Sequence, residues 1–473
     1  MQETEHQLSK YLQRLSLIVV AILITIAFVH AGRYAIINSD SGTYLATAEQ
    51  VAQGKVLYKN MYVGYTPIGI YFFALIKYMF GSQTTYLHYI YLVIAFIFLG
   101  GGIIYQLASA ISGKKHVGLL AALVYLMLAY KYEGIYIVLE PFVIVFGLGA
   151  LYCLYKSQRL RGLYFVAGVL LSCSFLSKQY GMLLVIPMAY YVFFSEEYLK
   201  LMLGNMMLFA LGLGTPLLIY FGIYESQYGI SPWSLIQAWT RYAHSYGERS
   251  LTKMLLAAGR FTISSLPFIL LLGLSIKKVL KRAYLFLQSL LLAYGVLALS
   301  LYYQQYAHYF LLLIPLGVLI AVYSGQILWE EKRFRLLILL LLGLNIGLLS
   351  VRNLGAFQEI WQAQLTQARI KQYQLAEEVN LYIPPHKQVL LLTYFHQRLN
   401  YLCHFPPLDA LQTGYTFPDN FSQAQLDTLM AKADWVLTEA YDLQHNPSYQ
   451  TLLHRYHFQQ RHILTNGLQL WGR

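Results

Sequence analysis

The hydrophobic positions of this chain gather into long blocks that are separated by short polar segments. Most blocks run for roughly 17 to 25 residues, which is the length a helix needs to cross about 30 Å of hydrocarbon. The pattern therefore predicts a polytopic α-helical membrane protein with about eleven transmembrane helices. The predicted spans are 15–33, 85–110, 117–130, 140–156, 162–177, 180–195, 201–224, 254–276, 284–302, 308–325 and 336–351.

The pattern changes after residue 351. Residues 355–382 show helical spacing of apolar positions, and Pro384-Pro385 would end that helix. Short β-like runs follow at 388–393, 435–438 and 458–471. The last run is bent at Asn466-Gly467, a dipeptide typical of hairpins. We expect a transmembrane domain over residues 1–351 and a small α/β domain over residues 352–473.

Composition supports lipid as the solvent for most of the chain. The sequence is 58% hydrophobic and 12% charged with a mean hydropathy of +0.48, whereas a soluble domain carries about 25% charged residues. The net charge of +13 could indicate a nucleic-acid partner. The basic residues lie between the apolar blocks, however, and form no stripe alternating with aromatics, so we expect no nucleic acid.

The distribution of Lys and Arg predicts how the chain is oriented. When the spans are threaded alternately through a bilayer, the inward segments are rich in basic residues, as cytoplasmic loops are. They carry Lys10, Arg14, Lys114, Lys115, Lys156, Arg159, Arg161, Lys200, Lys277, Lys278, Lys281, Arg282, Lys332, Arg333 and Arg335. The N-terminus is then cytoplasmic and the C-terminal domain extracytoplasmic, in a multi-pass protein of the plasma (inner) membrane. The first block could be a signal peptide, but its length and the spans that follow favour a retained helix.

Two outward segments are too long to be plain turns, because connections above about 15 residues are usually functional or disordered. The first covers residues 34–84. Within it, Ser41 to Gly54 is predicted to be a helix, and the short apolar stretch Pro67 to Phe80 to lie along the outer surface. The second covers residues 225–253 and contains Trp233, Trp239 and Arg241.

Charged groups near membrane depth are costly and therefore need an explanation. Asp40 could cap the helix after it or act as a catalyst, and spacing alone does not separate the two. Glu140, with Glu133 as a competitor, could start a helix before Pro141. Lys178 could be a snorkelling lysine, and His308 an interfacial structural histidine. In the threading above, these groups fall on the outward side, which predicts a polar cavity open to the outer face.

The cysteines and histidines give no metal signal. Cys153 and Cys173 lie inside apolar blocks and Cys403 lies in the polar tail, with neither a disulfide framework nor a CxxC pattern. Two carboxylates and one histidine are too few to identify a metal site. No metal ligands are therefore assigned, although a divalent cation is compatible with the sequence.

Several segments together resemble the GT-C superfamily of lipid-phosphosugar glycosyltransferases. Similar groups within it are the protein O-mannosyltransferases (glycosyltransferase family 39) and the lipid A aminoarabinose transferases. The similarity is carried, in chain order, by Asp40 and Tyr44, Gly54 with Leu57-Tyr58, Thr66 to Tyr71, Phe80-Gly81, Glu140-Pro141, Ser177-Lys178-Gln179, and Gln305 to Phe310 with Pro315. The family usually begins its first outer loop with Asp-Glu, whereas Ser41 follows Asp40 here.

The resemblance implies an inverting transfer of a sugar from a polyprenyl-phosphate donor to an acceptor hydroxyl at the outer face. It implies Asp40 as the general base that deprotonates the acceptor. The same resemblance makes Glu140 an acceptor-orienting or cation-holding group. Cations stabilise a departing lipid phosphate best in a dry site. The residues implied to bind that phosphate are Lys178, His308 and Arg241, and those implied to bind substrate are Tyr44 and Tyr309.

Other functions remain open on the sequence alone. A secondary transporter also has many spans and a few buried charges, but it typically shows inverted repeats, and no such internal symmetry is visible here. A membrane scaffold would leave Asp40, Glu140 and Lys178 without a shared purpose. A surface-polysaccharide polymerase or ligase uses related chemistry and is poorly separated. The acceptor could be a lipid, a glycan or a protein.

Overall fold

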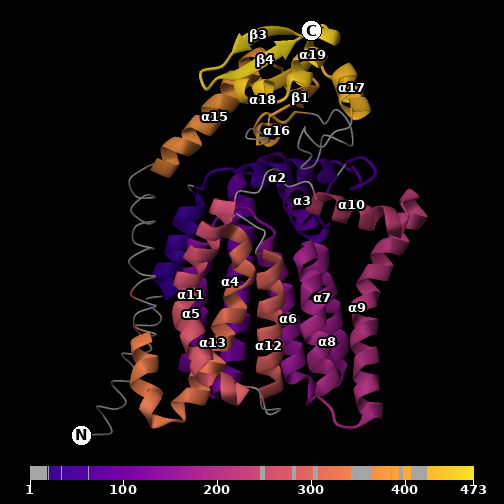
Figure 1. The fold of residues 1–473 in the computed structure, drawn as a ribbon. Coiled ribbons are helices and arrows are strands. Elements are labelled where there is room, and N and C mark those ends of the chain that lie inside the picture. The colour runs from indigo at the N-terminus through magenta and orange to yellow at the C-terminus, as the bar shows by residue number, and fades with distance from the viewer. Residues whose placement is uncertain are drawn as a thin grey trace.

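The computed structural model shows a long helical bundle with a small sheet-containing unit stacked on one end (Figure 1). It describes residues 21–33, 35–61, 63–244, 251–279, 284–301, 307–341, 364–384, 386–393, 398–405 and 423–473, with the single residues 19, 343 and 347. We call the end of the bundle next to the sheet the upper end, and the opposite end the lower end, as drawn in Figure 1.

Helices lie over the predicted spans wherever the structure describes them. They are Ala21–Arg33, α4 (Tyr86–Ser112), α5 (Lys115–Lys131), α6 (Glu140–Ser157), α7 (Gly162–Ser177), α8 (Val185–Phe194), α9 (Leu199–Tyr228), α11 (Leu251–Val279), α12 (Leu285–Leu301), α13 (Ile314–Trp329) and residues 335–341. The 3-10 segments η2 (Gln179–Leu184) and η4 (Ala307–Leu312) precede α8 and α13. By length and composition, α4 and α9 qualify as membrane spans within the described residues, and shorter apolar helices of 10–17 residues include α7, α12 and α13.

Two helices are a few residues longer than their approximate predicted spans. The chain was expected to leave the helical state near residue 224, but α9 continues to Tyr228 and ends at Gly229, whose φ of 68° is left-handed. The α11 helix also exceeds its predicted span at both ends. Helical hydrogen bonding does not stop where hydrophobicity falls; it stops where the backbone conformation changes. Between them lies α10 (Pro232–His244), so the described part of the second long outer segment is largely helical.

The outer surface of the bundle is apolar to an extent that water would not support. Along α9, large side chains repeat on one exposed face. Their exposed fractions are Leu203 55%, Met207 60%, Leu211 54% and Leu218 71%. Soluble monomers rarely expose continuous apolar patches beyond a few hundred Å². Together with the predicted spans, this surface indicates a multi-pass protein of the membrane.

The first long outer segment folds into two helices at the upper end (Figure 1). These are α2 (Ser39–Ala52) and α3 (Ile68–Phe80). The predicted helix start at Ser41 is two residues late, because Asn38 is the N-cap: its side chain accepts a 2.7 Å hydrogen bond from the Ser41 amide. A side-chain acceptor there satisfies one of the free amides of the first turn. Asp40 therefore lies inside the first turn and is not the cap.

The C-terminal unit is a four-stranded sheet with helices. Its helices are α15 (Gln364–Tyr382), α16 (Leu399–Leu402), α17 (Gln423–Lys432), α18 (Ala440–His445) and α19 (Pro447–Arg455). The strands are β1 (Val389–Leu391), β2 (Trp435–Glu439), β3 (Gln459–Ile463) and β4 (Leu468–Gly472), in the order β1-β2-β4-β3. The β1 and β2 strands are parallel and the other pairs are antiparallel. Gly467, with φ 86°, allows the predicted bend between β3 and β4. The predicted domain boundary at residue 351 lies outside the described residues.

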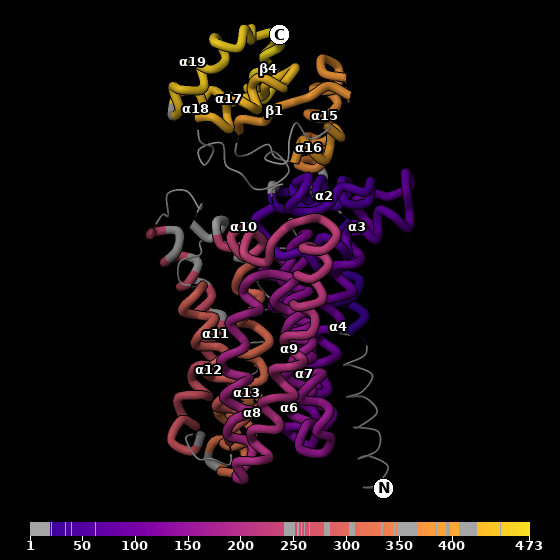
Figure 2. The backbone as a smooth tube through the Cα atoms, turned by 90° about the vertical axis from the view of Figure 1, so that its right-hand side faces the viewer, coloured from indigo at the N-terminus to yellow at the C-terminus, as the bar shows by residue number. Residues whose placement is uncertain are grey.

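The C-terminal unit rests on α2, as two perpendicular views show (Figure 2). The Gln372 side chain hydrogen bonds to both the amide and the carbonyl of Ile37, at 3.1 Å each. At the other end of α2, Glu49 accepts from His404 at 3.3 Å and from Lys77 at 2.9 Å. Burial opposes ionisation of Glu49, but the hydrogen bonds from His404 and Lys77 outweigh it and hold the pKa of this carboxyl below its ordinary value. The helix that carries Asp40 is thus held from above.

Candidate functional site

Five titratable side chains from distant parts of the chain meet at the upper end of the bundle. Each comes from the end of a helix or from a connection between helices. They are Asp40 in the first turn of α2, Glu133 between α5 and α6, Glu140 at the start of α6, Lys178 between α7 and η2, and His308 in η4. We call this group the upper polar cluster. It brings together the four residues that the sequence placed on the outward side, with Glu133 added.

Local sequence explains why these residues stand at helix ends. Pro141 occupies the first turn of α6, where a missing amide hydrogen costs nothing and a fixed φ favours helix initiation. Lys178 ends α7 in extended conformation, and its carbonyl accepts a 2.9 Å hydrogen bond from the Gly181 amide. A Cβ at position 181 would lie 2.4 Å from the backbone of Ser174 and Phe175. Only glycine fits this close turn.

Lys178 and Glu140 form a buried ion pair. Lys178 Nζ lies 2.5 Å from Glu140 Oε1, and the exposed fractions of the two side chains are 7% and 0%. In the described part of the chain, the second carboxylate oxygen of Glu140 has no hydrogen-bond partner. Buried polar atoms are normally satisfied. This atom is therefore a candidate acceptor for a substrate hydroxyl.

His308 links the three carboxylates of the cluster. Its Nδ1 lies 3.0 Å from Glu133 Oε2, which is a hydrogen-bond distance. Its Nε2 lies 3.8 Å from Asp40 Oδ2 and 4.0 Å from Glu140 Oε1. Because Glu133 is an acceptor, it favours a proton on Nδ1 and aims the opposite ring nitrogen at the other two carboxylates. Glu133 adopts a φ of 65°, which non-glycine residues seldom do.

Asp40 is more accessible than Glu140, and Glu133, at 35%, is the most exposed of the three carboxylates. Its side chain keeps 24% of its surface exposed, compared with 0% for Glu140. The surrounding protein still desolvates it: burial raises the pKa of Asp40 above its ordinary value of 3.8, while the charges of His308 and Lys178 oppose that shift. The Ser41 hydroxyl donates to the Ile137 carbonyl at 3.1 Å, which fixes the first turn of α2 against the chain that leads into Glu140.

Two tyrosine rings cover the ammonium group of Lys178. Its Nζ lies 4.4 Å from the centroid of the Tyr309 ring and 5.9 Å from that of Tyr180. The two rings contact each other edge to face at 5.5 Å. A cation held over aromatic faces and largely shielded from water attracts an anion more strongly than a solvated one. Tyr309 therefore lies beside the upper polar cluster, while its role in substrate binding stays a prediction; Tyr180 was not predicted as a site residue.

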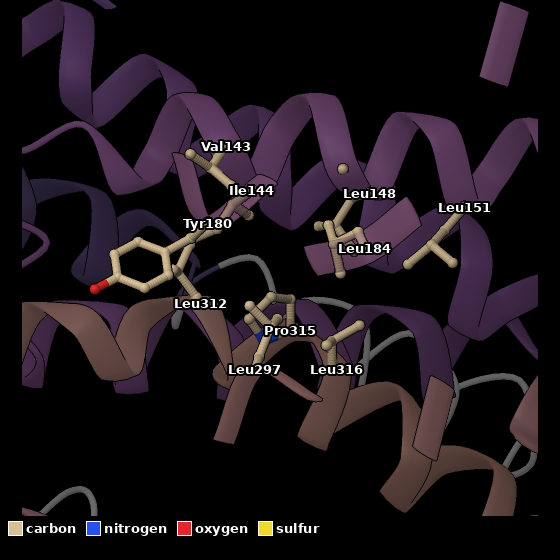
Figure 3. Close-up of a pocket in the computed structure, with 11 residues that line it drawn as sticks. Val143, Ile144, Leu148, Leu151, Tyr180, Leu184, Leu297, Leu312, Pro315 and Leu316 are labelled. Atoms are coloured by element: carbon tan, nitrogen blue, oxygen red, sulfur yellow. The ribbon is translucent and has the colours of Figure 1, made fainter. Parts of the chain in front are cut away.

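An apolar groove extends from Tyr180 to Leu151 along α6 (Figure 3). Its volume is about 320 Å³ including the space at its open sides. One face of α6 forms a wall, and the opposite wall comes from η2, α12, η4 and α13. The lining residues are Val143, Ile144, Gly147, Leu148, Leu151, Tyr180, Leu184, Leu297, Leu312, Pro315 and Leu316. The α6 residues begin one turn after Glu140, so the groove opens next to the Lys178–Glu140 pair.

The roles of two further predicted site residues, Tyr44 and Arg241, stay predictions. Tyr44 is buried and packs edge to face against Tyr65 at 5.1 Å, so its role in substrate binding stays a prediction. The side chain of Arg241 lies outside the described residues, although its backbone belongs to α10. Gln179, next to Lys178, donates to the carbonyls of Gly64 at 2.6 Å and Trp239 at 3.2 Å. It therefore joins both long outer segments to the Lys178 turn.

The described side chains include no group of three or more His, Cys, Asp and Glu residues arranged to hold a metal ion. The cationic groups of the cluster are Lys178 and, when protonated, His308.

Comparison with known proteins identifies the fold. No family model and no curated protein matches the sequence. Among solved structures, ArnT from Cupriavidus metallidurans in the apo state superposes with a TM-score of 0.60, 12% identity and 98% coverage of each chain. The same protein bound to undecaprenyl phosphate gives 0.63 and 12%, with 96% of this chain and 97% of that chain covered. This chain has the GT-C fold.

An Archaeoglobus fulgidus oligosaccharyltransferase, tethered with an acceptor peptide, also shares the GT-C fold. It gives a TM-score of 0.50 and 11% identity, with 96% of this chain and 74% of that chain covered. The resemblance read from the sequence motifs is thus confirmed at the level of the fold. At these identities the roles of individual residues rest on the geometry of the upper polar cluster.

Proposed function

We propose that the protein is an inverting glycosyltransferase that moves a sugar from a polyprenyl-phosphate donor to an acceptor hydroxyl. The observation that carries this proposal is the position of the Lys178 ammonium group. It lies in a polar cluster with an accessible carboxylate, Asp40, at the mouth of an apolar groove. A lipid-linked sugar phosphate needs these three features side by side.

The donor has a charged phosphate and an apolar chain, and each is assigned to the part of the site that matches it. Its phosphate binds at Lys178 and Tyr309, with the isoprenoid chain entering the groove along α6. In the reaction, the acceptor oxygen forms a bond to the anomeric carbon while the bond from that carbon to the phosphate oxygen breaks. The electron pair leaves with the phosphate, where a cation in a poorly solvated site stabilises the new charge. The acceptor proton passes to Asp40.

The other members of the cluster support this transfer. Glu140 accepts a hydrogen bond from the acceptor through its free oxygen and fixes Lys178 through the other. His308 stands within 4.0 Å of both Asp40 and Glu140 and holds the two carboxylates at their separation. Glu133 orients His308. We assign His308 to the donor phosphate as well, and Arg241 to the same role by its place in α10.

The proposal also includes the orientation of the chain in the membrane. Residues 1–351 form a transmembrane domain of about eleven helices, and residues 352–473 form an extracytoplasmic domain. The upper polar cluster then faces the outer side of the plasma membrane, and the N-terminus faces the cytoplasm. The concentration of Lys and Arg in the lower connections supports this orientation. The acceptor is a lipid, a glycan or a protein.

The direct test is donor consumption. Membranes containing the protein are incubated with a panel of radiolabelled polyprenyl-phosphate sugars, and the release of free polyprenyl phosphate is followed by thin-layer chromatography. We expect one donor to be consumed at a rate proportional to the amount of protein. Topology is checked separately by the accessibility of a cysteine introduced into the C-terminal domain. Consumption of no lipid-linked sugar, in the presence of envelope extracts as acceptor, contradicts the proposal.

Filling the groove should select against long donors. Leu297→Trp places a large ring in the groove from α12, so the KM for a long-chain donor should rise at least about tenfold, equivalent to about 1.4 kcal/mol of binding. A ten-carbon donor, which needs less of the groove, should be affected much less. The matched control is Leu299→Trp, because Leu299 is on the same helix but 74% exposed on the outside. Equal effects of both variants at both chain lengths would exclude the groove as the lipid site.

A further inference from the structure

A second cavity opens at the lower end of the bundle, on the side opposite the upper polar cluster. It has a volume of about 1540 Å³ including its open mouth, and it lies among the lower ends of α4, α6, α8, α12 and α13. On α6, the apolar groove ends at Leu151, and the lower cavity begins one turn later at Tyr155. The proposed transfer reaction uses no residue of this cavity.

The wall of the lower cavity is an aromatic cluster that carries hydroxyl groups. Phe286 contacts the rings of three tyrosines. The centroid distances are 5.1 Å to Tyr155, 5.5 Å to Tyr191 and 6.4 Å to Tyr323. In the described part of the chain, the hydroxyls of Tyr155 and Tyr323 have no hydrogen-bond partner, and both residues line the cavity. Aromatic faces together with available hydroxyls suit a ligand that has both C–H surface and polar groups.

The rim of the lower cavity is positively charged. Lys156 and Arg159 both line it, and neither forms an ion pair with any described residue. Lys156 Nζ lies 5.8 Å and 5.9 Å from the rings of Tyr152 and Tyr155, which keeps it beside the aromatic wall. The N-terminus of α12 at Leu285 also faces the cavity and adds partial positive charge. Glu197 is the acidic residue among the lining side chains, so the rim carries an excess of positive charge.

These observations go beyond what orientation in the membrane requires. Lysines and arginines that only mark the cytoplasmic side can lie anywhere in the lower connections. Here two of them border a large cavity whose interior offers tyrosine hydroxyls. A helix N-terminus and unpaired basic side chains are the groups that proteins use for phosphate.

We propose that the lower cavity binds a phosphate ester that carries hydroxyl groups, with the phosphate at Lys156 and Arg159 and the hydroxylated part against Tyr155 and Tyr323. Two sources share this chemistry. One is the headgroup of an anionic phospholipid in the leaflet at the lower end, and the other is a soluble phosphorylated polyol. The site is separate from the upper polar cluster and does not depend on the proposed transfer reaction.

The test uses the full-length protein purified in detergent. Its melting temperature is followed while dioleoyl phosphatidylglycerol, dioleoyl phosphatidylcholine or glycerol 3-phosphate is titrated, and bound lipid is counted by native mass spectrometry. We expect saturable stabilisation by phosphatidylglycerol, by glycerol 3-phosphate or by both, and none by phosphatidylcholine. Response to the lipid alone identifies the leaflet as the source. Response to the soluble ester identifies the polyol.

Three variants locate the binding. Lys156→Gln/Arg159→Gln should weaken the apparent affinity at least tenfold, and Ala110→Trp, which fills the cavity without changing charge, should do the same. Lys200→Gln is the matched control, because Lys200 is an exposed basic residue at the lower end of α9 outside the cavity. The proposal is overturned if neither probe stabilises the protein, if phosphatidylcholine acts equally, or if both cavity variants bind as tightly as the wild type.

Discussion

Replacing Asp40 with asparagine is expected to slow sugar transfer severely while leaving the protein folded. An amide has nearly the shape of the carboxylate but cannot accept the acceptor proton, and general-base catalysis contributes about 10²- to 10⁴-fold. Asn38 and not Asp40 caps α2, so the change removes no capping interaction. The measurement is single-turnover release of labelled polyprenyl phosphate, alongside the melting temperature. We expect a rate loss within that range and an unchanged melting temperature.

The protonation of Asp40 should also determine how transfer activity falls at low pH. Only the ionised Asp40 can act as a base, so activity falls as the pH drops through its pKa, which burial raises above 3.8. The opposing charge of His308 lowers that pKa, so His308→Gln should move the limb to higher pH. Asp427→Asn is a matched control in the C-terminal unit, where Asp427 pairs with Arg455 on the surface. A wild-type rate in Asp40→Asn would exclude this residue as the base.

Sequence patterns predicted the parts of the fold that depend on local chemistry. Runs of apolar residues predicted the positions of the bundle helices, because the length of such a run is read directly from consecutive residues. Asn466-Gly467 placed the β3–β4 hairpin, because few residues tolerate the backbone conformation of Gly467. The placement of Asp40, Glu140, Lys178 and His308 on one side followed from counting spans. The structure brings these four residues together.

Contacts between distant segments could not be predicted in the same way. Glu133 and Glu140 were competitors in the sequence, yet both approach His308, about 170 residues further on, through different ring nitrogens. Gln372 bonds to Ile37 across 335 positions. The groove is a space between five elements, each of which is largely apolar, so no periodic signal distinguishes its lining. Such features depend on how helices pack, and single-segment patterns do not contain that information.

Neutralising Lys178 is expected to have two separable effects. Lys178→Met leaves the buried Glu140 carboxylate without its counter-ion, and removing one partner of a buried pair costs about 3–5 kcal/mol. The single variant should therefore melt at a clearly lower temperature. In Lys178→Met/Glu140→Gln both charges are gone, and replacing a buried ion pair by neutral groups is often close to neutral for stability. The double variant should therefore recover most of the lost stability, as measured by thermal unfolding in detergent.

Unlike stability, donor binding is not expected to recover in the double variant. If Lys178 holds the donor phosphate, the KM for the lipid-linked sugar stays raised in the double variant, because restoring stability does not restore a cation at the Tyr309 ring. If Lys178 serves only as the counter-ion of Glu140, the KM returns toward the wild-type value together with the melting temperature, and the assignment to the phosphate is wrong. Comparing the single and double variants therefore distinguishes a Lys178 that only stabilises the fold from a Lys178 that binds the donor. The single variant alone cannot make this distinction.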